Sequence, residues 1–333
     1  MSYSVLRETL ADFKPPKPTY LPKDYPDLTD KVVFITGTST GIGYETTKLL
    51  LKQNATVVIF NRNKDKTDLA INNIKREIVE DNQNNFNDIK DLDSKIISII
   101  GDLSDLSTIT PSINSFKISN PQIKQLDLII LNAGVMQPPN GSKTIQGYEL
   151  QFGTNVLGHQ LVIKNINDLI LNSANLGNYP RVIWLSSIAH AMSPQTSGLS
   201  WDFNNANHSN SMEIYGQSKA ANIYQAYIYG QLFKDQNIIS VAVHPGYLKS
   251  ELQRSYNFIN RWISSSLLYH PIYGSYTELY AGLSKDITLE NNGDYYGPWG
   301  RPRLLRPDID KGRNDGTAKK LWDWVENELK PYL

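Results

Sequence analysis

Residues 32–43 read VVFITGTSTGIG, a run of apolar residues followed by a turn that contains three glycines. The branched apolar run predicts a buried strand, and residues 44–53 predict a helix after the turn. A strand, a glycine turn and a helix together present backbone N–H groups and a helix N-terminus to a phosphate. Because Gly37, Gly41 and Gly43 lack a Cβ, the backbone can turn tightly and approach a ligand closely. The first hypothesis is therefore a pyrophosphate-binding turn.

The same letters allow an alternative. Gly37 to Gly41 fits G-x-S-x-G, the motif around the nucleophilic serine of many hydrolases, which also lies between a strand and a helix. Ser39 would then be the nucleophile, and the candidate bases would be His190, His208, His244 and His270. This alternative is weakened because the strand before Ser39 is the first of the chain, so no earlier strand supplies an oxyanion-hole donor.

The composition narrows the classes of protein. Lys plus Arg and Asp plus Glu both number 33 among 333 residues, so no excess charge favours nucleic acid or an anionic membrane surface. The absence of cysteine excludes disulfides, thiolate metal sites and a cysteine nucleophile, and it fits a reducing, cytoplasmic location. No apolar run approaches the ~18 residues of a membrane span, and no signal-peptide core opens the chain. The five histidines are scattered without a metal-ligand spacing, so no metal site is expected.

Apolar, mostly branched runs alternate with helical patterns along the chain. Strands are predicted at 32–35, 56–60, 96–100, 126–131, 181–185 and 238–243. Helices are predicted at 44–53, 64–80, 149–173, 215–233, 274–285 and 316–329, and another follows residues 101–103 and ends at about residue 119. This alternation predicts an α/β fold, a single Rossmann-type doubly wound parallel sheet with helices on both faces.

The expected organisation is an arm followed by one domain. Residues 1–30 form an arm with five prolines, and residues 31–333 form the single Rossmann-type domain. Within it, residues 81–95 look like a solvated Asn- and Asp-rich insertion, residues 247–273 like a substrate lid, and residues from about 294 like a C-terminal extension.

The end of the second predicted strand bears on the choice of dinucleotide. Asn61, Arg62 and Asn63 stand where an acidic residue would bind the adenosine ribose 2′-OH of NAD. The acid is missing, and the guanidinium of Arg62 suits a 2′-phosphate. The plain alternative for Arg62 is a solvated surface side chain, so the missing acid is the firmer half of the argument for NADP.

Tyr215 and Lys219 lie at i and i+4 on one predicted helix. A nearby ammonium favours the phenolate and lowers the tyrosine pKa, which suits proton donation to a carbonyl oxygen. Ser187, at the end of the fifth strand, could donate a second hydrogen bond to that oxygen. The plain alternative is a surface Tyr–Lys pair and a helix-capping serine.

Taken in order, these motifs resemble the short-chain dehydrogenase/reductase superfamily from Lys31 to Ser284. They are Thr36-Gly37-x-x-x-Gly41-Ile42-Gly43, Asn132-Ala133-Gly134, Asn155, Ser187, Tyr215-x-x-x-Lys219 and Pro245-Gly246. Residues 152–159 (FGTNVLGH), 186–190 (SSIAH) and 244–246 (HPG) resemble the retinol-dehydrogenase and WW-domain-oxidoreductase branch and the fungal carbonyl reductases near it. The membrane-anchoring helix of many retinol dehydrogenases is missing, so a membrane-bound retinoid enzyme is not expected.

The resemblance implies four catalytic roles. Tyr215 would be the general acid in reduction, and Lys219 would lower its pKa and hold the nicotinamide ribose. Ser187, the second serine of its pair, would polarise the substrate carbonyl. Asn155 would hold a water that links Lys219 to solvent.

The resemblance also implies a set of cofactor contacts, which divide by the part of NADP(H) they would bind. Around the pyrophosphate and adenosine these are Gly37, Ser39, Thr40, Gly41, Ile42, Gly43, Arg62 and Asn63. Along the adenine and ribose they are Asp102, Leu103, Asn132, Ala133 and Gly134. At the nicotinamide end they are Tyr215, Lys219, Pro245, Gly246, Leu248 and Ser250.

The expected function is that of an NADPH-dependent carbonyl reductase acting on bulky apolar or aromatic carbonyl compounds. The pocket wall is expected to include Met136, Met192, Trp201, Phe203, Tyr247, Leu252, Tyr256, Phe258 and Trp262. The alternative is a non-catalytic NADP-binding sensor. Family members often dimerise through the helices placed here at 149–173 and 215–233, and Tyr224, Tyr227 and Tyr229 make a homodimer face a further hypothesis.

Overall fold

The computed structural model describes residues 11–81, 92–204, 210–249 and 268–333. One sheet has the strand order β3-β2-β1-β4-β5-β6-β7-β8, and every neighbouring pair is parallel except β7 and β8. The strands are β1 (Val32–Thr36), β2 (Thr56–Asn61), β3 (Ile96–Ile100), β4 (Leu128–Leu131), β5 (Arg181–Leu185), β6 (Ile239–Val243), β7 (Tyr295–Gly297) and β8 (Arg301–Pro302). The predicted α/β, doubly wound parallel sheet is thus confirmed.

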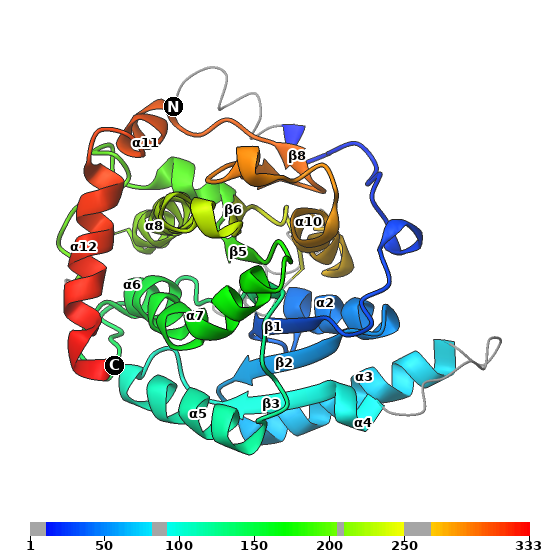
Figure 1. Cartoon of the computed structure of the whole chain (residues 1–333). Helices are drawn as coiled ribbons and strands as arrows, with labels where there is room; N and C mark the ends of the chain where they lie inside the picture. Colours follow the sequence, from blue (N-terminus) through cyan, green and yellow to red (C-terminus); the bar gives the residue numbers. More distant parts are fainter. Residues whose placement is uncertain (1–10, 82–91, 205–209, 250–267) are drawn as a thin grey trace.

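Helices cover both faces of the sheet (Figure 1). They are α2 (Gly41–Lys52), α3 (Lys64–Asp81), α4 (Leu92–Lys95), α5 (Leu106–Ser119), α6 (Leu150–Phe152), α7 (His159–Asn175), α8 (Ser211–Leu232), α10 (Ile272–Leu283), α11 (Pro307–Gly312) and α12 (Thr317–Leu329). Along β1, Phe34 packs into the core under α5, α7 and α8, whereas Val33 and Ile35 pack into the core under α2, α3 and α10. Strands buried on both faces explain why their sequences are continuously apolar rather than alternating.

Two features differ from the sequence prediction. The short strands β7 and β8 extend the sheet beyond β6. They were not predicted because β7 has three residues and β8 has two, which is too few to show a periodic pattern. The helix expected at 149–173 is α6 and α7 joined by a π-helical stretch, Gly153–Gly158. Such a stretch marks a local constraint, and here it contains Asn155.

Helix α12 lies against α8 on the outer side of the molecule (Figure 1). Of the three tyrosines that suggested a dimer face, Tyr224 and Tyr229 are buried within the chain, where their hydroxyls donate to Ser197 O and Asn167 Oδ1. These two side chains therefore serve the chain's own core. Within the described ranges, no helix combines the length and the apolar content that a bilayer crossing needs.

The described part of the N-terminal arm, from residue 11, packs across the surface. Tyr25 and Leu28 are buried in the core under α2 and α10, and Tyr20 meets Tyr280 of α10 edge-on at 5.7 Å between ring centroids. Of the predicted 81–95 insertion, the structure describes Asp81 and α4, and the rest lies outside the described residues.

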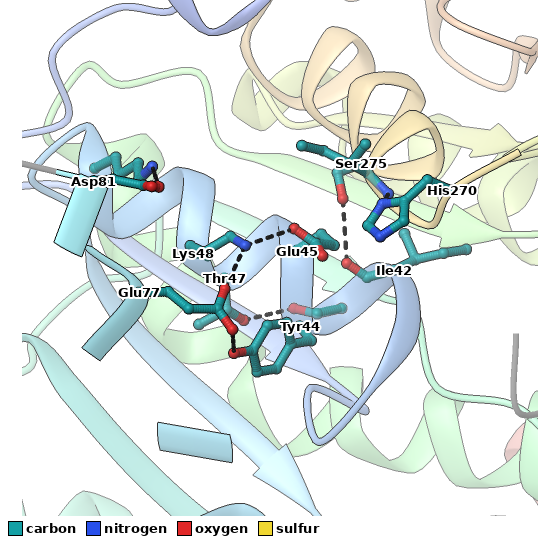
Figure 2. A network of polar contacts seen from close by, with 12 residues as sticks. Ile42, Tyr44, Glu45, Thr47, Lys48, Glu77, Asp81, His270 and Ser275 are labelled. Carbon is teal, nitrogen blue, oxygen red and sulfur yellow. Dashed lines mark hydrogen bonds and ion pairs between the residues drawn. The ribbon is translucent and has the colours of Figure 1, made fainter. Parts of the chain in front are cut away.

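Helix α2 is fastened on both sides (Figure 2). Lys48 Nζ lies 3.0 Å from Glu45 Oε2 and 2.7 Å from Glu77 Oε2 of α3, and the Tyr44 hydroxyl donates to the other oxygen of Glu77 at 2.7 Å. On the opposite side, Ser275 Oγ of α10 donates to Ile42 O at 3.2 Å. The helix that follows the glycine turn is therefore held in place by two neighbouring helices.

The contact between α2 and α10 contains a fully buried carboxyl group. Thr46 Oγ1 donates to Glu278 Oε2 at 2.5 Å, while Glu278 Oε1 has no hydrogen-bond partner among the described residues. Burial raises the pKa of Glu278 to about 8. Between its usual pKa and 8 the folded state keeps a proton that the unfolded state has lost, so stability falls as pH rises through this window.

Glu278→Gln should remove this pH dependence. We expect the variant to match the wild type near pH 5 and to exceed its free energy of unfolding by about 4 kcal/mol near pH 8.5, measured by urea unfolding. Glu77→Gln is the matched control, because the pairing of Glu77 with Lys48 and Tyr44 lowers its pKa against the opposing effect of burial. Its stability deficit should shrink towards acid pH. A Glu278→Gln difference that does not change with pH would contradict the prediction.

Candidate active site

The glycine turn between β1 and α2 depends on residues without a Cβ. Gly37 and Gly41 have φ values of 73° and 68°, in the left-handed region that favours glycine. A Cβ at Gly37 would lie 2.8 Å from Ala133 Cα, and one at Gly43 would lie 2.3 Å from Gly37 O. Asn132 Nδ2 donates to Gly37 O at 2.9 Å, which fixes the turn against the end of β4.

A cavity of about 270 Å³ opens above this turn, at the carboxyl ends of the central strands. Among its lining residues are twelve of the predicted cofactor contacts: Gly37, Ser39, Thr40, Gly41, Ile42, Arg62, Asn63, Asp102, Leu103, Asn132, Ala133 and Gly134. Gly43 lies behind the turn rather than in this wall. Parallel α/β sheets bind ligands at this edge, so the cavity fits the adenosine and pyrophosphate part of a dinucleotide.

Sequence reasoning assigned no role to several lining residues, namely Phe60, Lys66, Gly101, Val135, Thr154 and Leu185. Lys66 had a readable signal, because it lies four residues after Arg62 at the start of α3 and is the second cation of the wall. In the sequence, Asn61 showed only that no acidic residue stands at the end of β2. In the structure it has a role of its own, because its Oδ1 accepts from Thr38 N at 2.7 Å and its Nδ2 donates to Thr38 Oγ1 at 2.8 Å. It ties the end of β2 to the glycine turn.

Arg62 lines the cavity next to Asp102, in the part predicted to hold the adenosine. Its Nε lies 3.9 Å from Asp102 Oδ2, and its side chain is 61% exposed. Asp102 Oδ1 is already fixed, since it accepts from Ser104 N and Ser104 Oγ. A long, exposed ion pair contributes little stability, so the guanidinium is free to turn towards an anionic ligand.

The catalytic candidates meet where α8 touches the 3₁₀ segment that follows β5 (Ile188–Met192). Gly216 allows this contact, because a Cβ there would lie 2.5 Å from Ala189 O. Tyr215 and Ser187 stand beside the contact point. Ser186 Oγ donates to Lys219 O at 2.8 Å, whereas Ser187 Oγ accepts from Ala189 N at 3.1 Å and keeps its proton for another acceptor.

Lys219 is buried at the floor of this site. Its Nζ donates to Leu185 O at 2.7 Å and to Asn222 Oδ1 at 3.3 Å, and it lies 5.7 Å from the centroid of the Tyr215 ring. Because no carboxylate compensates its burial, desolvation lowers the pKa of Lys219 to about 7. Lys219 therefore interconverts between ammonium and neutral amine near neutral pH.

Asn155 is held by the π-helical stretch. Its amide bonds both backbone groups of Val135, with Oδ1 accepting from the N–H at 2.9 Å and Nδ2 donating to the carbonyl at 3.0 Å. Its own carbonyl accepts from Asn222 Nδ2 at 2.8 Å, and Asn222 also accepts from Lys219. The stretch thus joins the end of β4 to the Lys219 side of α8.

His159 supports the same stretch. Asn155 O can only accept, so His159 Nδ1 donates to it at 3.1 Å, and Nε2 of the neutral ring accepts from Thr36 Oγ1 at 3.0 Å. Thr36 Oγ1 in turn accepts from Ala133 N. Burial lowers the pKa of His159 to about 3, so the ring is neutral. His159 is thus a buried structural residue of this helix.

The sequence of this chain is similar to those of known proteins. The family model described as short chain dehydrogenase matches residues 31–198. A short-chain dehydrogenase/reductase of Phomopsis amygdali is 34% identical over 100% of this chain and 99% of its own length. This protein belongs to the short-chain dehydrogenase/reductase family. A second relative, from Neocamarosporium betae, is 32% identical over 96% of this chain and 92% of its own.

Solved structures of the same fold come from distant relatives. A 3-ketoacyl-(acyl-carrier-protein) reductase from Brucella melitensis complexed with NADH has a TM-score of 0.59 at 16% identity, covering 81% of this chain and 96% of its own. A Shigella flexneri short chain dehydrogenase complexed with NADP has a TM-score of 0.58 at 17% identity, covering 82% and 98%. The carbonyl reductase Sniffer of D. melanogaster has a TM-score of 0.58 at 18% identity, covering 83% and 100%. As a member of this family, the protein is an oxidoreductase that uses a nicotinamide cofactor.

Arg306 fixes the first part of the loop between Ser187 and Tyr215, and residues 205–209 of that loop lie outside the described part of the chain. The guanidinium donates to Ala191 O, Ser193 O and Pro194 O and pairs with Asp308. The loop's two aromatic residues face away from the site: Phe203 stacks on Phe152 at 4.0 Å, and the ammonium of Lys320 lies 4.0 Å from the centroid of the Trp201 ring. The expectation that Trp201 and Phe203 line the pocket is therefore wrong, because both pack under or against α12.

The residues predicted to contact the nicotinamide follow β6. Gly246 has a φ of 98°, and Leu248 is buried against Gly274 of α10, where a Cβ would lie 2.5 Å from Leu248 Cδ1. Pro245 precedes them at the carboxyl end of β6. Ser250 lies outside the described residues, as do Leu252, Tyr256, Phe258 and Trp262 of the expected pocket wall.

The hydrolase alternative loses its support. Ser39 lines the cofactor cavity, and no histidine within the described part of the chain is bonded to it. The described residues also hold no group of three or more metal-ligating side chains. The glycine turn is better explained as part of the dinucleotide site of a short-chain dehydrogenase/reductase.

Proposed function

We propose that this enzyme is an NADPH-dependent carbonyl reductase that acts on bulky apolar or aromatic ketones and aldehydes. The observation that carries the proposal is the site around Lys219, whose buried Nζ lies 5.7 Å from the centroid of the Tyr215 ring and donates to Leu185 O, two residues before Ser187. An amine with a pKa near 7 next to a phenol suits transfer of a proton to a developing alkoxide near neutral pH.

In this proposal the cofactor supplies the hydride. Ser187 and Tyr215 donate hydrogen bonds to the substrate oxygen and stabilise the negative charge that develops there. Tyr215 then delivers its phenolic proton, and Lys219 favours the resulting phenolate by its charge. Asn155 and Asn222 hold Lys219 in position, and Asn155 would carry the water of the proton relay.

The test is oxidation of NADPH, followed at 340 nm, over aliphatic, aromatic and diketone substrates with NADH as the comparison. Reduction of aromatic ketones at a rate above that of the Tyr215→Phe protein would support the proposal. Tight NADPH binding with no turnover over the whole panel would favour the non-catalytic sensor instead.

Arg62 is proposed to recognise the 2′-phosphate together with Lys66. Both side chains line the adenosine end of the cavity, and both can reach an anion there. Arg62→Asp should raise the KM for NADPH by at least about tenfold and leave that for NADH within about twofold, because only NADPH brings a second charge to this point.

Arg76→Asp is the matched control, since it makes the same charge change on α3 outside the cavity wall. It should leave both Michaelis constants unchanged. Equal effects of Arg62→Asp on NADPH and NADH would show that Arg62 does not recognise the phosphate.

A further inference from the structure

The N-terminal arm is anchored to the residue that follows β8 by a buried ion pair. Asp12 is 1% exposed, and the Nε of Arg303 donates to its two oxygens at 3.0 and 3.3 Å. Arg301 adds a second anchor by donating to Lys17 O at 3.1 Å. Figure 1 shows the arm passing β8 before it runs down to β1. Asp12 and Arg303 are 291 residues apart in the sequence. Burying a charge is costly unless it is well paired, so this ion pair gives the arm one defined position, its seat on the domain.

This seat is close to the catalytic candidates. Arg303 N donates to Tyr295 O at 2.9 Å, and the Tyr295 hydroxyl lies 3.4 Å from His190 Nδ1. His190 Nδ1 in turn lies 2.8 Å from Ser187 O. Burial raises the pKa of Tyr295 well above its usual value, and the nearby Asp12 and Tyr215 raise it further. The arm therefore reaches the neighbourhood of Ser187 and Tyr215 rather than a remote surface.

A second contact joins the arm to the segment after β6. The Phe13 ring stacks on the Tyr247 ring with 4.0 Å between centroids and 10° between planes. Tyr247 follows Gly246, and its ring also meets His244 edge-on at 5.9 Å. Its backbone pairs with Tyr269, where Tyr269 N donates to Tyr247 O at 2.9 Å. Tyr247 is thus held by two contacts, one with His244 after β6 and one with Phe13 of the arm.

We propose that Asp12, Phe13, Tyr247 and Arg303 form an arm clamp, in which the arm fixes Tyr247 as one wall of the substrate pocket. The proposal rests on the reductase function proposed above and deepens it. A stacked aromatic pair presents a flat, rigid apolar face, which suits an aromatic or other bulky apolar carbonyl compound. Phe13 and Asp12 are positioning residues that act through Tyr247.

Kinetics of Phe13→Ala test the clamp. Phe13 is 51% exposed, so its truncation should leave folding intact. The KM for a bulky aryl ketone should rise about tenfold, while kcat, the KM for a small aliphatic ketone and the Kd for NADPH stay within about twofold. Phe13→Tyr should restore the wild-type KM. Tyr20→Ala, which removes an aromatic contact of the same arm against α10, should leave both ketones unaffected.

The attachment of the arm is measured separately, by the rate of chymotrypsin cleavage after Phe13. Asp12→Asn and Arg303→Met should each accelerate this cleavage at least about tenfold. Unchanged cleavage, or a Phe13→Ala protein whose two ketone KM values move equally or not at all, would overturn the clamp. A wild-type protein that reduces no ketone would overturn the reductase function and with it the substrate role. The cleavage rates would still decide whether the arm is seated.

Discussion

Tyr215→Phe should lower turnover by about 10²-fold or more while NADPH binding stays nearly intact. The substitution removes only the phenolic oxygen, so the ring keeps its place on α8 beside Lys219, where it is 7% exposed. What is lost is the proton donor and one of two hydrogen bonds to the developing alkoxide. Steady-state kinetics with NADPH, together with titration of nicotinamide fluorescence, separate the chemical step from binding.

Tyr229→Phe is the matched control for that experiment. It makes the same change on the same helix, where the hydroxyl donates to Asn167 Oδ1 at 2.6 Å away from the site. It should cost about 1 kcal/mol of stability and leave turnover within about twofold. Near-normal turnover in Tyr215→Phe would remove Tyr215 from the proposed mechanism.

The sequence predicted the parts of the site that depend on local patterns. The strand before Gly37 is apolar because both faces of β1 are buried. Apolar runs of this kind can be recognised in the sequence, so the glycine turn, Asn132 and Arg62 could be predicted to lie at strand ends. Tyr215 and Lys219 lie four residues apart on a helix, so the spacing alone brings their side chains together.

Other parts of the site depend on contacts that no local pattern records. Gly216 reads as an ordinary helical glycine, yet it allows the approach of α8 to Ala189. Arg306 and Arg303 read as basic residues of a tail, but each binds a segment more than a hundred residues earlier. Trp201 and Phe203 were misplaced for the same reason, since their hydrophobicity predicts burial but not which surface covers them.

The burial of Lys219, which lowers its pKa, reduces the stability of the folded protein. Its folded-state pKa is about 7 against 10.5 for an ordinary lysine. Between these values the unfolded chain holds a proton that the folded protein has lost, so this contribution to stability rises with pH across the window. Below pH 7 the folded protein must bury the charge, and the cost is then at its largest.

Lys219→Met should therefore abolish measurable turnover and stabilise the cofactor-free protein at acid pH. Near pH 6 we expect a gain of about 1–3 kcal/mol, because relief of the desolvation cost exceeds the two hydrogen bonds lost at Leu185 and Asn222. The gain should vanish towards pH 10, where the buried amine is neutral in the wild type. Lys48→Met is the control of opposite sign, because Lys48 is paired with Glu45 and Glu77 and its removal should destabilise. A Lys219→Met protein less stable than the wild type near pH 6 would mean that its hydrogen bonds outweigh the burial of its charge.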